Sequence, residues 1–130
     1  MARSGARYPT ELELQILKVL WCEKSCSVRE VREALAEAGR ELAHTTVVTM
    51  LHTMTDKEFV HRDRINAKSY RFTARVSEES VSTGMLGDLL QRVFDGSAAG
   101  LVLNLLESEH VDEEEHKALR RLINRRRKES

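Results

Sequence analysis

Residues 43–53, AHTTVVTMLHT, hold the side chains in this chain that are best suited to touching another molecule. Together with the next residue, Met54, this stretch has one apolar face at helical spacing, which consists of Val47, Leu51 and Met54. The opposite face is polar and consists of Thr45, Thr46, Thr49 and His52. Threonine is a poor helix former because its β-branch restricts the side chain against the preceding turn. Small hydroxyl and methyl groups can approach base edges and phosphates closely, so we expect this polar face to contact DNA.

Two points about this helix stay open. His44, at its start, can either cap the helix or touch a phosphate, and the sequence favours neither role. The polar face as a whole could also be an ordinary solvent-exposed side of a helix. The cost of its β-branched residues and the basic segment that adjoins it favour contact with a partner.

A basic segment, FVHRDRINAKSYRFTARV, follows at residues 59–76 and changes the hydrophobic period towards two, as in a strand. Alternate positions on the outgoing strand hold Val60, Arg62 and Arg64, and residues 65–67 form the expected turn. Residues 57–75 contain six basic and two acidic residues. We expect phosphate contacts from the basic side chains of this hairpin, namely Arg62, Arg64, Lys68 and Arg71. The alternative is a charged strand edge that only prevents aggregation.

Two helices must precede and position these segments. Thr10 with Glu13, and Ser27 with Glu30, have the spacing of capping boxes at the starts of helices over residues 10–21 and 27–39. Gly39 is a plausible stop for the second helix. Three helices followed by a hairpin within about 65 residues is the order of a winged helix-turn-helix. We therefore predict a mainly α fold with a small β-hairpin wing, in which residues 1–76 form the DNA-binding domain.

Residues 77–130 are predicted to form a three-helix C-terminal dimerisation region, with helices over residues 78–95, 97–109 and 112–128. The leucine-rich positions of these helices exceed what three short helices can bury against themselves, so a second chain is expected to cover them. The predicted dimer interface consists of Leu89, Val93, Leu101, Leu105, Leu119 and Ile123. A two-fold dimer would place two recognition helices about 34 Å apart, one turn of DNA, or a multiple of it.

Charge and composition narrow the function further. The formal net charge is zero, but residues 1–76 hold 13 basic and 10 acidic residues, whereas residues 77–130 hold 8 and 11. A local basic patch can still bind phosphate because salt screens the distant acidic half. No apolar run is long enough to span a membrane, and MARSGARYPTE lacks the apolar core of an export signal, so we expect a cytoplasmic protein.

The sequence does not indicate an enzyme, a metal site or a cofactor. It contains no glycine-rich phosphate loop, no nucleophile–histidine–acid order and no paired carboxylates in apolar surroundings. Cys22 and Cys26 have a C-x3-C spacing, but no nearby Cys or His pair completes a zinc site. We interpret Cys26 and Cys22 as helix-end residues partly in the core.

The segments PTELELQILKVLW, SVREV, TTVVTML and SYRF, taken together, resemble the penicillinase-repressor family, also called BlaI/MecI/CopY. The resemblance covers roughly residues 9–125. It implies a dimeric bacterial winged-helix repressor of promoter DNA with a helical C-terminal dimerisation region. Three departures are visible. Thr45 and Val48 stand where some members have basic residues, and Glu58 where many have Gly. The absence of Cys after Cys26 does not fit the copper-responsive branch.

A second resemblance concerns LVLNLLE at residues 101–107, which is similar to the segment cut during induction of antibiotic-responsive members. In those members the cut is attributed to signalling by a membrane-bound sensor metalloprotease. Carried over, the resemblance implies cleavage between Asn104 and Leu105. A cut there would divide the dimerisation region and lower operator occupancy without touching the DNA contacts.

Two other functions remain open at this stage. The chain could be a winged-helix protein–protein adaptor whose threonine-rich face binds a partner protein. It could also be a DNA-binding repressor without proteolytic control, in which a small ligand or oxidation of the Cys22 thiol is the signal.

Overall fold

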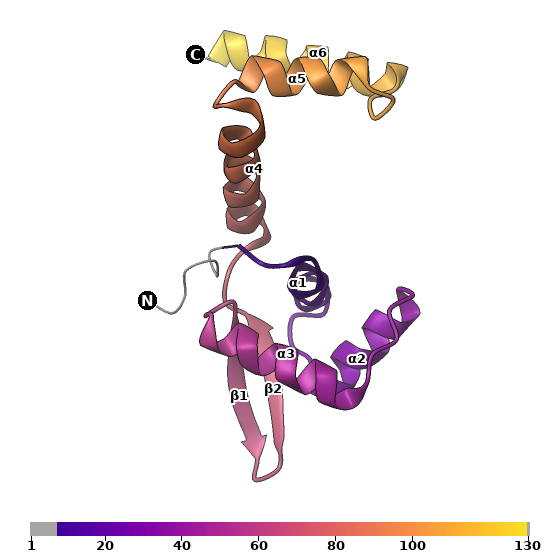
Figure 1. Cartoon of the computed structure of the whole chain (residues 1–130), viewed down its shortest axis with the longest axis vertical. Helices are drawn as coiled ribbons and strands as arrows, with labels where there is room; N and C mark the ends of the chain where they lie inside the picture. Colours follow the sequence, from indigo (N-terminus) through magenta and orange to yellow (C-terminus); the bar gives the residue numbers. More distant parts are fainter. Residues whose placement is uncertain (1–7, 130) are drawn as a thin grey trace. The chain divides into compact units, whose positions relative to one another are not determined.

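The computed structural model describes residues 8–129, which form helices and one β-hairpin. The elements are α1 (Glu11–Glu23), α2 (Val28–Glu37), α3 (His44–Asp56), β1 (Val60–Asn66), β2 (Ser69–Ala74), α4 (Glu78–Phe94), α5 (Ala98–Glu107) and α6 (Glu113–Glu129) (Figure 1). The predicted mainly α fold, with its hairpin directly after the third helix, is confirmed. Residues 1–7 lie outside the described residues. They are part of the segment from which we expected no export signal.

Local sequence signals start the first two helices, and stop the second, as predicted. At the start of α1, the Thr10 hydroxyl accepts from the Glu13 backbone and the Glu13 carboxylate from the Thr10 backbone, a complete capping box. Ser27 and Glu30 do the same for α2. Gly39 follows α2 with a φ of 91°, a left-handed conformation that glycine adopts without steric cost.

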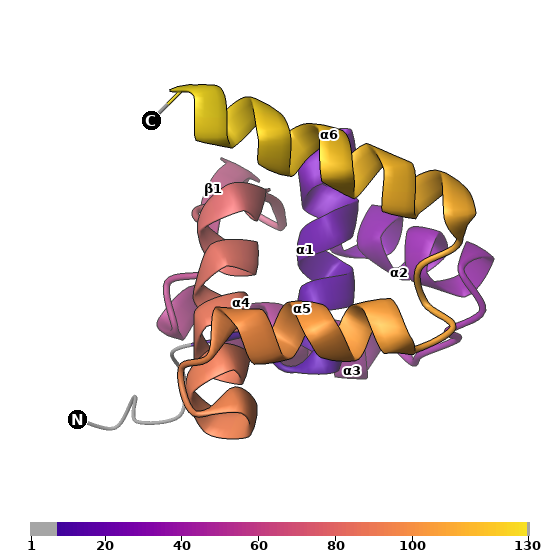
Figure 2. The ribbon, with the colours of Figure 1, turned by 90° about the horizontal axis from the view of Figure 1, so that it is seen from above.

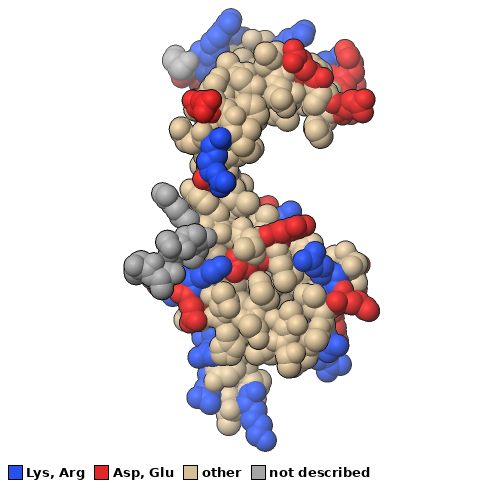
Figure 3. Space-filling model, in the orientation of Figure 1, with Lys and Arg blue, Asp and Glu red and all other residues tan. Residues whose placement is uncertain are grey.

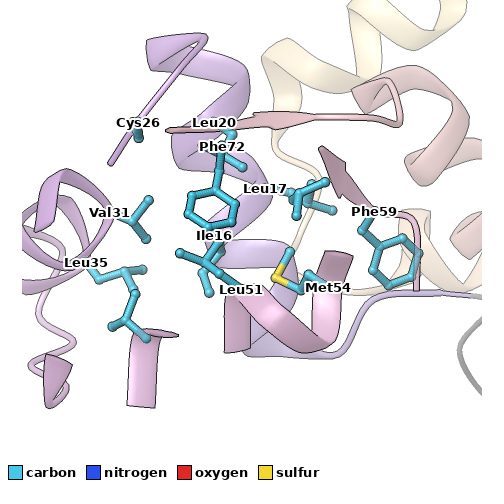
Figure 4. Close-up of a cluster of buried hydrophobic side chains, with 12 residues drawn as sticks. Ile16, Leu17, Leu20, Cys26, Val31, Leu35, Leu51, Met54, Phe59 and Phe72 are labelled. Atoms are coloured by element: carbon cyan, nitrogen blue, oxygen red, sulfur yellow. The ribbon is translucent and has the colours of Figure 1, made fainter. Parts of the chain in front are cut away.

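One apolar core holds α1, α2, α3 and the hairpin together (Figure 4). Its members come from every one of these elements and are Ile16, Leu17, Leu20, Cys26, Val31, Leu35, Val47, Leu51, Met54, Phe59, Val60 and Phe72. Burying a side chain of this size contributes about 1.5–3 kcal/mol. The three α3 residues predicted to face inward are fully buried, so the core determines which face of α3 remains exposed.

The hairpin is antiparallel and pairs Val60 with Ala74, Arg62 with Phe72, and Arg64 with Tyr70. On its other edge, Phe72 exchanges two backbone hydrogen bonds with Cys26, at 3.0 and 2.7 Å. The turn lies at residues 67–68, whereas the sequence placed it at residues 65–67, so the prediction was one to two residues too early. The reason is the Asn66 side chain, whose Oδ1 accepts from the backbone N–H groups of Lys68 (2.9 Å) and Ser69 (3.1 Å) and so closes a tighter turn.

A buried ion pair joins the start of α1 to the end of α3. Glu13 is 1% exposed, and its Oε2 accepts from the Nζ of Lys57 at 2.8 Å. Its Oε1 accepts from the backbone N–H of Thr10. Lys57 is the residue that caps the C-terminus of α3. Because both carboxylate oxygens have partners, the charge is compensated inside the core.

The chain divides into two compact units, the first ending at Met85 and the second beginning at Leu86. This boundary lies inside α4, nine residues beyond the functional boundary expected near residue 76, which stays a prediction. In the second unit, α5 and α6 diverge from their connecting turn (Figure 2), and neither helix contains a buried residue. No helix in residues 8–129 has the length and apolar content to cross a membrane.

Candidate nucleic-acid interface

The exposed face of α3 carries all the residues predicted for it. His44, Thr45, Thr46, Thr49 and His52 are each exposed. Their placement follows from the helical period, because the three buried positions of α3 lie on the opposite side and are anchored in the core. DNA contact by these side chains stays a prediction, and the geometry leaves all five accessible to a partner.

A hollow of about 350 Å³ lies between the start of α2, one side of α3 and the inner face of the hairpin. Its lining residues are Ser27, Val28, Arg29, His44, Val48, His52, Arg62, Lys68, Ser69, Tyr70 and Phe72. Three of these are Lys or Arg, two are histidines and, among the described residues, no acid lines it. Figure 3 shows Lys and Arg side chains gathered at the free end of the hairpin. The fold thus combines His44, His52, Arg62 and Lys68 in one concave basic surface, and Thr45, Thr46 and Thr49 lie on α3 outside it.

The two arginines of β1 share one aromatic neighbour. The guanidinium carbon of Arg62 lies 4.5 Å, and that of Arg64 5.5 Å, from the centre of the Tyr70 ring. Arg64 also donates to the carbonyl oxygens of Asn66 (3.3 Å) and Ala67 (3.2 Å) in the hairpin turn. In the described part of the chain, Arg62 has no ion pair, so its hydrogen-bond donors are available to a phosphate.

Arg71 has a different environment from the other predicted phosphate contacts. Its guanidinium donates to the Ser25 hydroxyl (2.9 Å), the Ser25 carbonyl (2.8 Å) and the Glu30 carboxylate (2.9 Å). The backbone N–H of Ser27 and the guanidinium of Arg71 hold the pKa of Glu30 below its usual value. Phosphate contact by Arg71 stays a prediction, but this arginine already ties β2 to the turn between α1 and α2.

The N-terminus of α3 has no side-chain cap, unlike those of α1 and α2. Its N-cap residue is Ala43, which offers no acceptor to the first backbone N–H groups of the helix. Arg29 and Arg32 of α2 line a neighbouring hollow of about 690 Å³ together with His44, but Glu33 and Glu41 line it too, and Glu33 pairs with Arg29 at 3.1 Å. Arg29 and Arg32 were not singled out from the sequence, because isolated arginines on a helix resemble any solvated face.

Replacing Ala43 with Asp is expected to raise the free energy of unfolding by about 1 kcal/mol, because a carboxylate at the N-cap accepts from the free N–H groups. The same change is expected to weaken DNA binding, since it places a negative charge next to His44, which lines the basic hollow beside the hairpin. Thermal unfolding and duplex titration measure the two effects. Ala43→Ser is the matched control and should stabilise without the loss of affinity. Tighter binding by the Asp variant would contradict a phosphate-facing role for this helix end.

The two cysteines have different environments. No group of three His, Cys, Asp or Glu residues in residues 8–129 is placed to hold an ion. Burial, with smaller contributions from Glu30 and Glu23, raises the pKa of the Cys26 thiol, which keeps it protonated and poorly reactive. Cys22 is exposed, whereas it was expected to lie partly in the core with Cys26. Control through oxidation of Cys22 stays a prediction.

The predicted dimer residues are all accessible in the single chain. Leu89, Val93, Leu105 and Ile123 are exposed, and Leu101 and Leu119 are half-buried. Further large apolar residues that are exposed on the same helices are Leu86, Val102, Leu103 and Leu122. Asn104 and Leu105, the two residues of the expected cleavage bond, lie within α5 and are also exposed.

Comparison with known proteins identifies the family. The family model described as Penicillinase repressor matches residues 9–125. The transcriptional regulator BlaI of Mycobacterium tuberculosis is 31% identical over 115 residues, which cover 87% of this chain and 80% of that protein. The methicillin resistance regulatory protein MecI of Mammaliicoccus sciuri is 24% identical over 114 residues, which cover 88% of this chain and 91% of that protein.

Solved structures of other proteins share the fold. RosR of H. salinarum has a TM-score of 0.53 at 16% identity, covering 96% of this chain and 99% of that chain. The complex structure of hsRosR-S4 has a TM-score of 0.54 at 18% identity, covering 95% of this chain and 94% of that chain. At these identities the likeness shows the fold alone, and the function follows from the family match. The chain therefore belongs to the penicillinase repressor family and is a DNA-binding transcriptional repressor, not an enzyme.

Proposed function

We propose that two copies of this chain bind a palindromic operator in double-stranded promoter DNA. In each copy the exposed face of α3 enters the major groove, where Thr45, Thr46 and Thr49 contact base edges. The basic side chains that line the hollow beside α3 hold the phosphate backbone. The observation that carries this proposal is the hollow itself, because the hairpin and the start of α2 supply three Lys or Arg side chains, and α3 supplies two histidines, to one concave surface.

The proposed homodimer rests on the apolar surface of the second unit. Val93 is 61% and Ile123 58% exposed, and α5 and α6 contain no buried residue. Several large apolar side chains on neighbouring helices are more than a single chain normally leaves in water. A second copy would cover them with an identical surface, as two-fold interfaces do.

We also propose that repression is relieved by cleavage between Asn104 and Leu105, triggered by a membrane-bound sensor metalloprotease. The support is the LVLNLLE segment and the names of relatives such as the penicillinase repressor of Staphylococcus aureus and the methicillin resistance regulatory protein MecI. Proteases bind extended segments, so α5 must unwind locally before the bond can be cut. A helix without buried residues unwinds at small cost. In this account the chain works in the cytoplasm, where promoter DNA lies.

Salt titration of DNA binding tests the electrostatic part of the proposal. Arg62→Ala is expected to flatten the slope of log K against log salt by about two units, because each of two copies loses one phosphate contact at about 0.9 per contact. Lys68→Ala should do the same, and Arg92→Ala, which removes a cation outside the hollow, should leave the slope unchanged. Binding is measured on duplexes from the chain's own upstream region. An unchanged slope for both Arg62→Ala and Lys68→Ala would remove the hollow from the interface.

A further inference from the structure

The aromatic ring of Tyr70 lies under the two arginines of β1, Arg62 and Arg64. The guanidinium of Arg62 is 4.5 Å and that of Arg64 5.5 Å from the ring centre. We propose that Tyr70 is a positioning residue that holds these two guanidinium groups in the orientation in which they meet the DNA backbone. This inference rests on the proposed function, because it assumes that the two arginines contact DNA phosphates.

The hairpin register explains why these three side chains meet. Arg64 lies directly opposite Tyr70, and Arg62 lies opposite Phe72, the next residue on the same face. Alternate residues of a strand point to the same side, so the face that begins with buried Val60 and Phe72 continues outward as Arg62, Tyr70 and Arg64. The stack is therefore built into the pairing of β1 and β2.

The Tyr70 ring is itself held in place. It is half-buried and packs against the apolar core, so the ring has one anchored side and one side toward the arginines. Two guanidinium groups of like charge repel each other, and the negative face of an aromatic ring offsets part of that repulsion. A guanidinium stacked on a ring can still donate from its N–H edge to phosphate oxygens. This edge is open in Arg62, whereas Arg64 already donates from Nε and Nη2 to carbonyl oxygens of the turn.

The stack also determines the direction in which Arg62 points. Arg62 and Tyr70 both line the basic hollow, together with His44, Val48 and His52 of α3. Arg62 is exposed and, within residues 8–129, forms no ion pair, so the ring is the contact that orders it. Without the ring, Arg62 would lose side-chain freedom on binding DNA, and that entropic cost would lower the affinity.

The experiment compares Tyr70→Phe with Tyr70→Leu in the full-length protein, on duplexes from its own upstream region at one fixed salt concentration. Phenylalanine keeps the ring, so its affinity should match the wild type. Leucine keeps apolar volume but not the ring, and we expect the affinity to fall by about tenfold, roughly threefold for each copy. A separate titration over a range of salt concentrations should give the wild-type slope, because the arginines still reach phosphate. A lower affinity for Tyr70→Phe would assign the effect to the hydroxyl and overturn the proposal.

A double-mutant cycle separates positioning from a general structural effect. In an Arg62→Ala, Arg64→Ala background, Tyr70→Leu should have almost no further effect on affinity. A full tenfold loss in that background would overturn the proposal. Arg62→Lys leaves the ring and the core untouched, so this variant still tests the proposal if Tyr70→Leu does not fold. It should lower the affinity severalfold, because lysine does not stack as arginine does, and wild-type affinity would count against the stack.

The same measurements distinguish failure of this inference from failure of the proposed function. If the wild type binds none of these duplexes, the DNA proposal itself fails. If the wild type binds them and Tyr70→Leu binds equally well, only the positioning role is overturned.

Discussion

A chain that ends at Asn104 is expected to bind a palindromic operator at least about 100-fold more weakly than the intact chain. The reason is that the shortened chain lacks α6 and the end of α5, which carry exposed Leu105, Leu122 and Ile123. Without this surface the two copies no longer form a stable pair, and the second half-site loses the high effective concentration that the dimer provides. Sedimentation and duplex titration measure the two steps separately.

The control for this prediction is a duplex that contains a single half-site. All twelve residues of the apolar core that joins α1, α2, α3 and the hairpin lie before residue 73, so the shortened chain keeps the whole winged-helix domain. Its affinity for a single half-site should therefore equal that of one copy of the intact chain. If the shortened chain binds the palindrome as tightly as the intact chain does, dimerisation through the second unit does not support repression.

Replacing Lys57 with Met is expected to lower the free energy of unfolding by about 2–3 kcal/mol. The change removes the partner of Glu13, whose side chain is 2% exposed, and leaves a carboxylate in the core with only the Thr10 cap to compensate it. We place the effect below that of a fully buried pair because the Lys57 side chain is 22% exposed. In a domain of this size the midpoint of thermal unfolding should fall by about 10 °C.

The matched control adds Glu13→Gln to Lys57→Met. The amide keeps the shape of the side chain but carries no charge, so the double variant should recover much of the lost stability, whereas independent effects would add. If Lys57→Met unfolds at the wild-type temperature, the ion pair does not hold the end of α3 against α1.

The local features of the fold could be predicted because neighbouring residues create them. Capping boxes act over three residues, so Thr10 and Ser27 indicate the starts of α1 and α2 in the sequence itself. Helical period likewise showed which side of α3 would be buried. The hairpin turn was misplaced because one side chain, Asn66, determines it through two backbone contacts that no period reveals.

The candidate interface was predictable in outline and not in detail. Sequence composition indicated a basic wing, but four cations of one hairpin look equivalent along the chain. The fold gives them different environments: Arg62 stacks on Tyr70, whereas Arg71 donates to Ser25 and Glu30, which lie more than 40 residues earlier. Arg29 joins the hollow from α2, which the spacing along the chain could not show.

The sequence by itself determined the class of this protein: a winged-helix repressor, with its helix starts, its exposed threonine face and its apolar C-terminal helices. These follow from period, capping and composition, which act between residues close together along the chain. Only the tertiary structure decided which cations remain available to DNA, that Glu13 and Lys57 meet in the core, and that two arginines lie over the Tyr70 ring. The physical reason is that a charge or a ring has its effect through whatever lies within a few ångströms, and long-range packing alone brings those groups together.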